Sequence, residues 1–139
     1  MATRSRIGLE LKDGSILSAY HHWDGYPAWL GRILNTHYNT KEKVSELIDG
    51  GDMSSAWTNC GWQNETRSET GPMYYSERGE NCPPRLDKDH GEYLKMGGES
   101  DEEYSYLFTT QGEWICYDTC TWHDTYLESV EIPSGALAA

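Results

Sequence analysis

The chain has 139 residues, a formal net charge of −12 and a hydrophobic content of 37%. This length suits one domain with one core, and the 6 Trp and 10 Tyr residues add apolar bulk to it. No run reaches the ~18 apolar residues of a membrane span, and the first residues lack the apolar stretch of a secretory signal. We therefore expect a cytoplasmic protein without membrane association, with one domain over residues 1–133 and a frayed tail at 134–139.

The negative charge is unevenly distributed along the chain. Residues 1–49 carry six Lys or Arg and six Asp or Glu, whereas residues 50–139 carry five and seventeen. An acidic surface repels phosphate backbones, so we expect no nonspecific nucleic-acid binding. Attraction to a basic patch on another protein is one interpretation of this charge, and the solubility of a small domain is the other.

Two β-hairpins and a last strand are predicted. Apolar–polar alternation marks residues 6–11, 104–109 and 126–132, and Asp13-Gly14 and Gln111-Gly112 supply the turns of the hairpins. The expected strands are residues 6–11, 16–23, 104–109, 114–118 and 126–132.

Two helices are predicted between the hairpins. Residues 28–38 space their apolar side chains as a helix does, after Pro27. Residues 41–48 follow Thr40, whose hydroxyl can cap the free backbone donors, and Gly50-Gly51 ends this helix. The expected fold class is α+β, a twisted antiparallel sheet of about five strands with two helices packed on one face.

Three segments give weaker signals. Residues 52–71 are polar and rich in Trp, without clear periodicity. Residues 72–76 have the composition of a short strand. Residues 77–98 are predicted to form a long charged excursion, with a helical turn near residues 92–94.

The densest polar and aromatic cluster is His21-His22-Trp23-Asp24. With His37 it can be drawn as a metal or acid–base site, so a small metal-dependent hydrolase is the enzymatic alternative. Alternation along a strand places the two adjacent imidazoles on opposite faces, where they cannot share one metal without a bulge. The simpler interpretation is structural, with Asp24 capping a turn and Trp23 filling the edge of the core.

A second candidate is Arg78-Gly79-Glu80, because arginine offers planar donors that suit a carboxylate or a phosphate. The structural alternative is an internal ion pair that fastens a loop. Tryptophans such as Trp57 and Trp62 can stack on a base or anchor a partner protein, although core packing also accounts for them. The candidate ligand- or partner-binding residues are His22, Trp23, Asp24, Tyr26, Arg32, Tyr75, Arg78 and Glu80.

The sequence contains no phosphate-binding loop, dinucleotide-binding motif or nucleophile elbow. We therefore expect no cofactor and favour a binding protein over an enzyme. A zinc site could be formed by Cys116, Cys120 and His123, with Cys60 or Cys82 as the fourth ligand. The favoured interpretation is that these cysteines are buried free thiols.

Several short segments in the same order resemble a family of small uncharacterised proteins found mainly in tailed bacteriophages. They are residues 1–7, His22-Trp23-Asp24-Gly25-Tyr26-Pro27, and residues 31–38, 78–80 and 103–108. The likeness covers most of residues 1–118. Members often carry Cys at the position of His21, which argues against an essential imidazole there.

The resemblance implies a viral accessory protein that acts in the cytoplasm of the host cell. Phage proteins of this size commonly counteract a host defence or a host enzyme by binding it. We therefore expect a non-enzymatic protein that binds a host protein through an acidic, aromatic-rich surface. Sequestration of a small nucleotide signalling molecule is the alternative binding function, and a virion component is a third class. A homo-oligomer is compatible with each of these.

Overall fold

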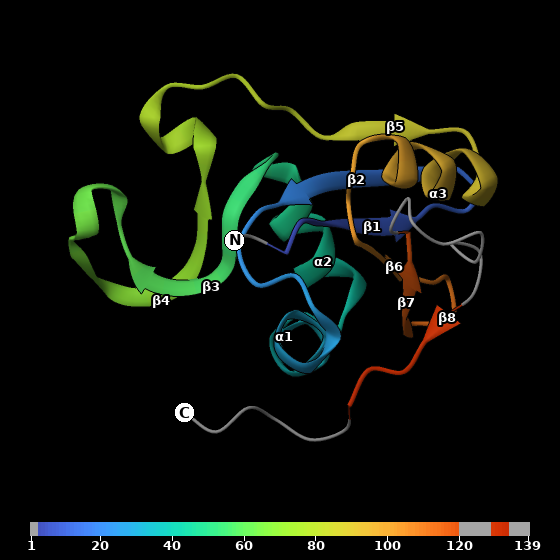
Figure 1. Cartoon of the computed structure of the whole chain (residues 1–139), viewed down its shortest axis with the longest axis horizontal. Coiled ribbons are helices and arrows are strands. Elements are labelled where there is room, and N and C mark those ends of the chain that lie inside the picture. Colours follow the sequence, from blue (N-terminus) through green and yellow to red (C-terminus); the bar gives the residue numbers. More distant parts are fainter. Residues whose placement is uncertain (1–2, 120–128, 134–139) are drawn as a thin grey trace.

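The computed structural model describes residues 3–119 and 129–133, and it shows an α+β fold with one mixed sheet and three helices (Figure 1). The sheet has eight strands in the order β4-β3-β2-β1-β6-β7-β8, and β5 pairs separately with β2. The strands are β1 (Ser5–Glu10), β2 (Ile16–His21), β3 (Met53–Cys60), β4 (Thr66–Tyr74), β5 (Arg85–Asp87), β6 (Tyr104–Phe108), β7 (Trp114–Asp118) and β8 (Ser129–Val130). The helices are α1 (Arg32–His37), α2 (Lys41–Asp49) and α3 (His90–Glu99), with short helical turns η1 (Pro27–Gly31), η2 (Trp62–Asn64) and η3 (Tyr75–Arg78).

Both predicted hairpins are confirmed. Strands β1 and β2 pair antiparallel, and Gly14 adopts a φ of 88° in the turn between them. Strands β6 and β7 also pair antiparallel, with Gly112 at a φ of 80°. Glycine carries such positive φ values without a steric penalty, which explains why these two turns could be predicted. Of the expected last strand, β8 lies within residues 126–132, and residues 126–128 lie outside the described part.

The prediction of an antiparallel sheet is wrong, because two of its pairings are parallel. Strand β1 pairs with β6 in parallel over five register positions, and β2 meets β3 in parallel at His21 and Met53. Strand β1 is therefore a central strand, with β2 on one side and β6 on the other. The two predicted hairpins join into one sheet along β1 and β6.

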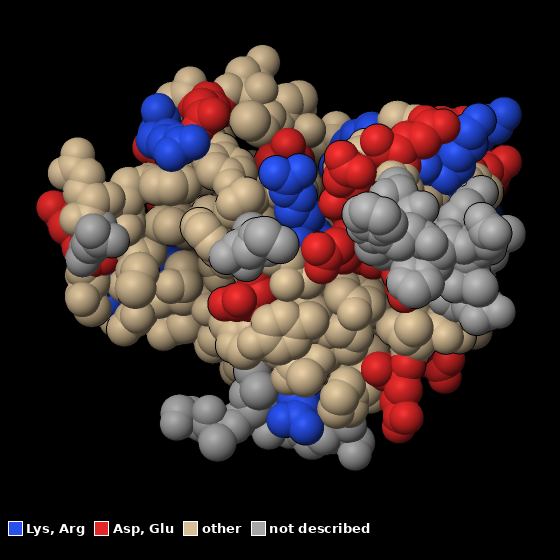
Figure 2. Space-filling view, viewed as in Figure 1, with Lys and Arg blue, Asp and Glu red and all other residues tan. Residues whose placement is uncertain are grey.

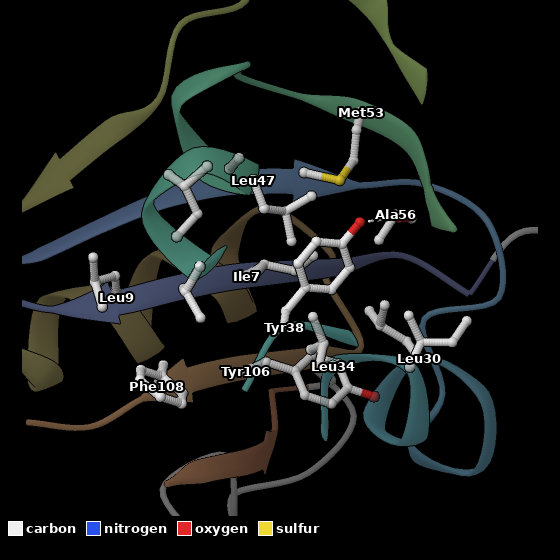
Figure 3. Packing of buried hydrophobic residues seen from close by; sticks show 14 of the residues in the cluster. Ile7, Leu9, Leu30, Leu34, Tyr38, Leu47, Met53, Ala56, Tyr106 and Phe108 are labelled. Atoms are coloured by element: carbon white, nitrogen blue, oxygen red, sulfur yellow. Dashed lines mark hydrogen bonds between the residues drawn. The ribbon is translucent and has the colours of Figure 1, made fainter. Parts of the chain in front are cut away.

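The two predicted helices, α1 and α2, pack on one face of the sheet as expected, but a third helix, which the prediction did not include, covers the opposite face. Helices α1 and α2 bury Leu34 and Leu47 against Ile7 and Leu9 of β1 in the main core (Figure 3). Helix α3 packs on the opposite face, where the space above Gly8 is filled by the ring of its Tyr93. Because successive residues of a strand point to opposite faces, β1 contributes to both cores.

The predicted helices form close to their expected positions. Residues 28–38 fold as η1 followed by α1. Helix α2 begins after Thr40, whose Oγ1 accepts a hydrogen bond of 3.2 Å from the Lys43 backbone N–H. This contact is the N-terminal cap that the sequence predicts. None of the helices in residues 3–119 and 129–133 is long and apolar enough to cross a membrane.

The segment without clear periodicity forms a hairpin that projects from the body of the molecule, here called the arm (β3, η2 and β4; Figure 1). Its pairing is interrupted by register shifts at three places, which removes the regular alternation of a strand. The guanidinium of Arg67 holds the arm together by donating to the carbonyls of Thr58, Gly71 and Pro72.

Residues 77–98 also hold more regular structure than the sequence predicts. The segment contains β5 on the edge of β2 and the ten-residue helix α3. Asp89 caps α3, since its Oδ1 accepts a hydrogen bond of 2.9 Å from the Glu92 backbone N–H. The predicted tail at 134–139 lies outside the described residues.

Replacement of Gly8 by Ala should destabilise the protein by about 1–3 kcal/mol. The added methyl group would lie 2.9 Å from the ring of Tyr93, which is fully buried. The hydroxyl of Tyr93 also donates to the carbonyl of Tyr106, so the ring cannot move freely. Urea denaturation of the variant and the parent protein measures this difference.

The matched control is Gly71→Ala in β4, where an added Cβ meets nothing within 4 Å. This control should stay within about 0.5 kcal/mol of the parent protein. Equal stability of the Gly8 and Gly71 variants would show that α3 does not pack on β1 as described.

Candidate functional site

The end of β2 lies beside the start of β3. The backbone N–H of His22 donates to the carbonyl of Met53 at 3.2 Å, and that of Trp23 donates to the carbonyl of Ser54 at 2.9 Å. Because the two strands run in the same direction, the residues that follow His21 continue along β3. This pairing brings Trp23 and Asp24 to the base of the arm.

A groove of about 470 Å³ lies between these residues and the arm, and four of the six tryptophans of the chain line it. We call it the tryptophan groove. One side is built by residues that follow β2, and the other by β3, η2 and β4. The lining residues used below are Trp23, Asp24, Trp29, Ser54, Trp57, Trp62 and Gln63.

The tryptophans differ in how firmly they are held. Trp57 stacks on the imidazole of His37, with ring centroids 3.7 Å apart and planes inclined by 12°. It also meets the ring of Tyr38 edge-on. Trp23 is less enclosed, because 48% of its surface is exposed. The groove therefore combines a fixed indole with an accessible one.

The outer edge of the groove carries an aromatic and ionic cluster. The rings of Trp62 and Tyr75 lie 5.7 Å apart, and the guanidinium carbon of Arg78 lies 4.5 Å from the centre of the Trp62 ring and 5.0 Å from that of Tyr75. The Nε of Arg78 also donates to a carboxylate oxygen of Glu80. This arrangement joins a cation–π contact to an ion pair.

Two polar atoms of groove residues are buried and lack a hydrogen-bond partner within the described part of the chain. They are the Oγ of Ser54, a residue that is 1% exposed, and the Nε1 of Trp62. Leaving such a group unpaired costs about 1–3 kcal/mol, so both favour a hydrogen-bonding partner brought by a bound molecule. Among the described lining residues, Asp24 is the one that carries a charge.

Charge is distributed unevenly over the face seen in Figure 2. Acidic side chains gather over the part of the molecule that carries α3 and β5, while the arm shows fewer charged side chains. The tryptophan groove thus lies in a weakly charged region of a strongly acidic protein.

The structure brings most of the predicted binding residues to this region. Trp23 and Asp24 line the groove, and Tyr75, Arg78 and Glu80 form the cluster at its outer edge.

Three other predicted residues are not among the lining residues. The ring of His22 meets that of Trp23 edge-on, and its Nδ1 lies 2.7 Å from the hydroxyl of Tyr20. Tyr26 is exposed, and Arg32 lies on α1.

The histidines proposed for a metal site lie in different surroundings. His21 is fully buried with its Nδ1 3.3 Å from the Oγ of Ser5, His22 bonds to Tyr20, and His37 stacks on Trp57. Over residues 3–119 and 129–133, no group of three His, Cys, Asp or Glu side chains is close enough to hold a metal ion. Burial lowers the pKa of His21 to about 3, so this imidazole is neutral near pH 7.

The zinc hypothesis is not tested by these observations. Cys120 and His123 lie outside the described residues, while Cys60, Cys82 and Cys116 are free thiols. Cys116 is buried in β7, and burial raises the pKa of its thiol to about 12.

Three of the lining residues named above, Trp29, Ser54 and Gln63, were not identified from the sequence. Trp29 lies in η1 within the segment predicted as a helix, and Ser54 and Gln63 lie in the segment without periodicity. The one feature of the sequence that pointed to this side of the groove was the tryptophan content of residues 52–62. Comparison with protein families, curated proteins and solved structures gave no match.

Acidification should destabilise the protein through His21. Its pKa is lowered in the folded state, so the unfolded chain binds a proton first, and stability is lost as the pH falls below about 6.5. Between pH 7.5 and pH 5 this loss should be about 2 kcal/mol, because the folded protein cannot protonate the imidazole.

Urea denaturation of the parent protein and of His21→Cys at these two pH values measures the effect. Cysteine carries no group that titrates in this range, so the variant should lose about 2 kcal/mol less stability on acidification. An identical dependence on pH in both proteins would show that His21 is not the buried neutral group described.

Proposed function

We propose that this protein acts by binding a partner protein and that the tryptophan groove is its contact surface. The observation that carries the proposal is the convergence of four tryptophans from two separate segments on one groove. Tryptophan is enriched among the residues that contribute most to protein interfaces, because a large ring can be buried with little loss of conformational entropy.

The exposure of Trp23, a lining residue, and of Tyr26, which lies close to it in the sequence, supports this role. Trp23 and Tyr26 are two of the three large hydrophobic residues that are exposed within the described part of the chain, at 48% and 39%, and they lie three residues apart. Both leave apolar surface in water, and a partner that covers it would gain hydrophobic free energy.

The resemblance to phage proteins supports the identity of the partner class. A viral accessory protein that works by binding would act on a host protein, such as a defence factor or an enzyme, in the cytoplasm of the host. The net charge of −12 favours a partner with a basic surface, because complementary charge speeds encounter and selects among partners.

A small nucleotide is the second candidate ligand. The indole rings of the groove offer stacking faces that suit any base. The phosphate groups would meet an acidic protein, and Asp24 is the charged residue among the described groove residues. Charge therefore favours the protein partner over the nucleotide.

Trp23→Ala should weaken the binding of the partner at least ~30-fold, which corresponds to about 2 kcal/mol. Trp23 is suited to this test because its ring is half-exposed and its loss should leave the core intact. The tagged full-length chain is used to capture the partner from a host lysate, and the dissociation constant of each variant is then measured with the purified partner.

The control is Leu86→Ala, which removes an exposed apolar side chain from β5, outside the groove. This variant should bind the partner as the parent protein does. Unchanged affinity of Trp23→Ala would refute the groove as the contact surface. Recovery of a nucleotide, identified by mass spectrometry after heat release, would support the second candidate instead.

A further inference from the structure

The tryptophan groove has the chemistry of a site for a cationic side chain. Indole faces carry negative electrostatic potential and attract a cation placed over them. Asp24 adds a full negative charge among the described lining residues, and no lysine or arginine is among them. A positively charged group is therefore the kind of occupant that both the rings and the carboxylate favour.

The protein already contains a cluster of this kind at the edge of the groove. The guanidinium of Arg78 lies over the rings of Trp62 and Tyr75 and pairs with Glu80. The planar guanidinium of an arginine stacks on aromatic faces and binds carboxylates with two parallel hydrogen bonds. The compact ammonium group of a lysine does both less well. The groove is lined by the same kinds of group, since Trp23 and Trp57 supply aromatic rings and Asp24 supplies a carboxylate.

The unpaired polar atoms of the groove specify a further property of the occupant. The Nε1–H of Trp62 is a donor and favours an oxygen acceptor in the bound molecule, whereas the hydroxyl of Ser54 can either donate to such an acceptor or accept a hydrogen bond. A polypeptide segment supplies such acceptors at every residue through its backbone carbonyls. A segment that carries an arginine thus provides both the cation and the acceptors.

The backbone of the groove is held in an uncommon conformation on both sides. Asp24 and Gln63, both lining residues, have φ values of 56° and 69°. Non-glycine residues with such angles are uncommon and cluster at binding sites, where the surrounding structure holds them in place. Next to Asp24, a Cβ at Gly25 would lie 2.3 Å from the Oγ of Ser5, so this loop is closely packed.

We infer that the tryptophan groove binds an arginine side chain presented by an extended segment of the partner protein, with Asp24 pairing with its guanidinium. This inference rests on the proposed function and adds the chemistry by which the partner is recognised. The rings of Trp23 and Trp57 contact the guanidinium plane, while Ser54 and Trp62 donate hydrogen bonds to the backbone of the segment.

The test uses the full-length protein and the peptide acetyl-Gly-Ser-Arg-Ser-Gly-amide, titrated by tryptophan fluorescence. Two matched peptides replace the arginine by citrulline, its neutral isostere, or by lysine. The arginine peptide should bind at least ~10-fold more tightly than the citrulline peptide, and more tightly than the lysine peptide. Equal binding of the arginine and citrulline peptides would overturn the inference.

Two charge variants locate the cation. Asp24→Asn should weaken binding of the arginine peptide ~5-fold or more while keeping the fold, because asparagine tolerates positive φ. Glu99→Gln removes an equal charge from the exposed end of α3 and should leave binding unchanged. An equal loss in both variants would indicate attraction to the net charge alone and would overturn the role of Asp24.

The outcomes separate this inference from the proposed function. If Trp23→Ala abolishes partner binding but the arginine peptide shows no advantage, the inference fails and the proposed function stands. If Trp23→Ala leaves partner binding unchanged, the proposed function fails. Saturable binding of adenosine monophosphate with no binding of the arginine peptide would overturn the inference in favour of a nucleotide.

Discussion

The burial of strand β1 on both faces is the constraint on which the rest of the fold depends. Ile7 and Leu9 enter the core below α1 and α2, and Gly8 faces Tyr93 of α3. A strand covered on both faces requires helices on both sides of the sheet. The chain meets this requirement by placing α1 and α2 after the first hairpin and α3 before the second. The parallel pairing of β1 with β6 then joins the hairpins.

The tryptophan groove is a consequence of how the remaining strands attach to this centre. Strand β3 pairs with β2 at His21 and Met53 only, and the arm beyond that point extends away from the body. Met53 and Ala56 at the start of β3 are buried in the main core, and Arg67 ties the strands of the rest of the arm together. The space between the arm and the residues after β2 becomes the groove.

Local signals explain which parts of the fold could be predicted. The turns at Gly14 and Gly112 and the cap at Thr40 depend on neighbouring residues, and the sequence shows them directly. Helix α3 was predicted only as a helical turn near residues 92–94, because Gly97 and Gly98 lower helix propensity. Glycine at position 97 lets α3 pack closely on β6, since a Cβ there would lie 2.6 Å from the Oγ of Ser105. Tertiary packing here outweighs local preference.

The candidate site could be predicted only in part, for the same reason. Trp23 and Asp24 stood out because polar and aromatic residues cluster there in the sequence. Their approach to Trp57 and Trp62 depends on a pairing between strands more than 30 residues apart, which alternation cannot reveal. The register shifts of the arm also hid β3 and the first part of β4, whose end lies within the strand predicted at residues 72–76. Contacts between distant segments therefore determine the site.

The indole N–H resonances of the protein offer the most direct test of the central claim. They are recorded with and without the purified partner in a two-dimensional nitrogen–proton spectrum of the full-length chain. We expect the signals of the groove tryptophans, Trp23, Trp29, Trp57 and Trp62, to move. That of Trp114, which donates to the carbonyl of Tyr38, should stay in place. Partner binding that leaves the four groove signals unchanged would contradict the account.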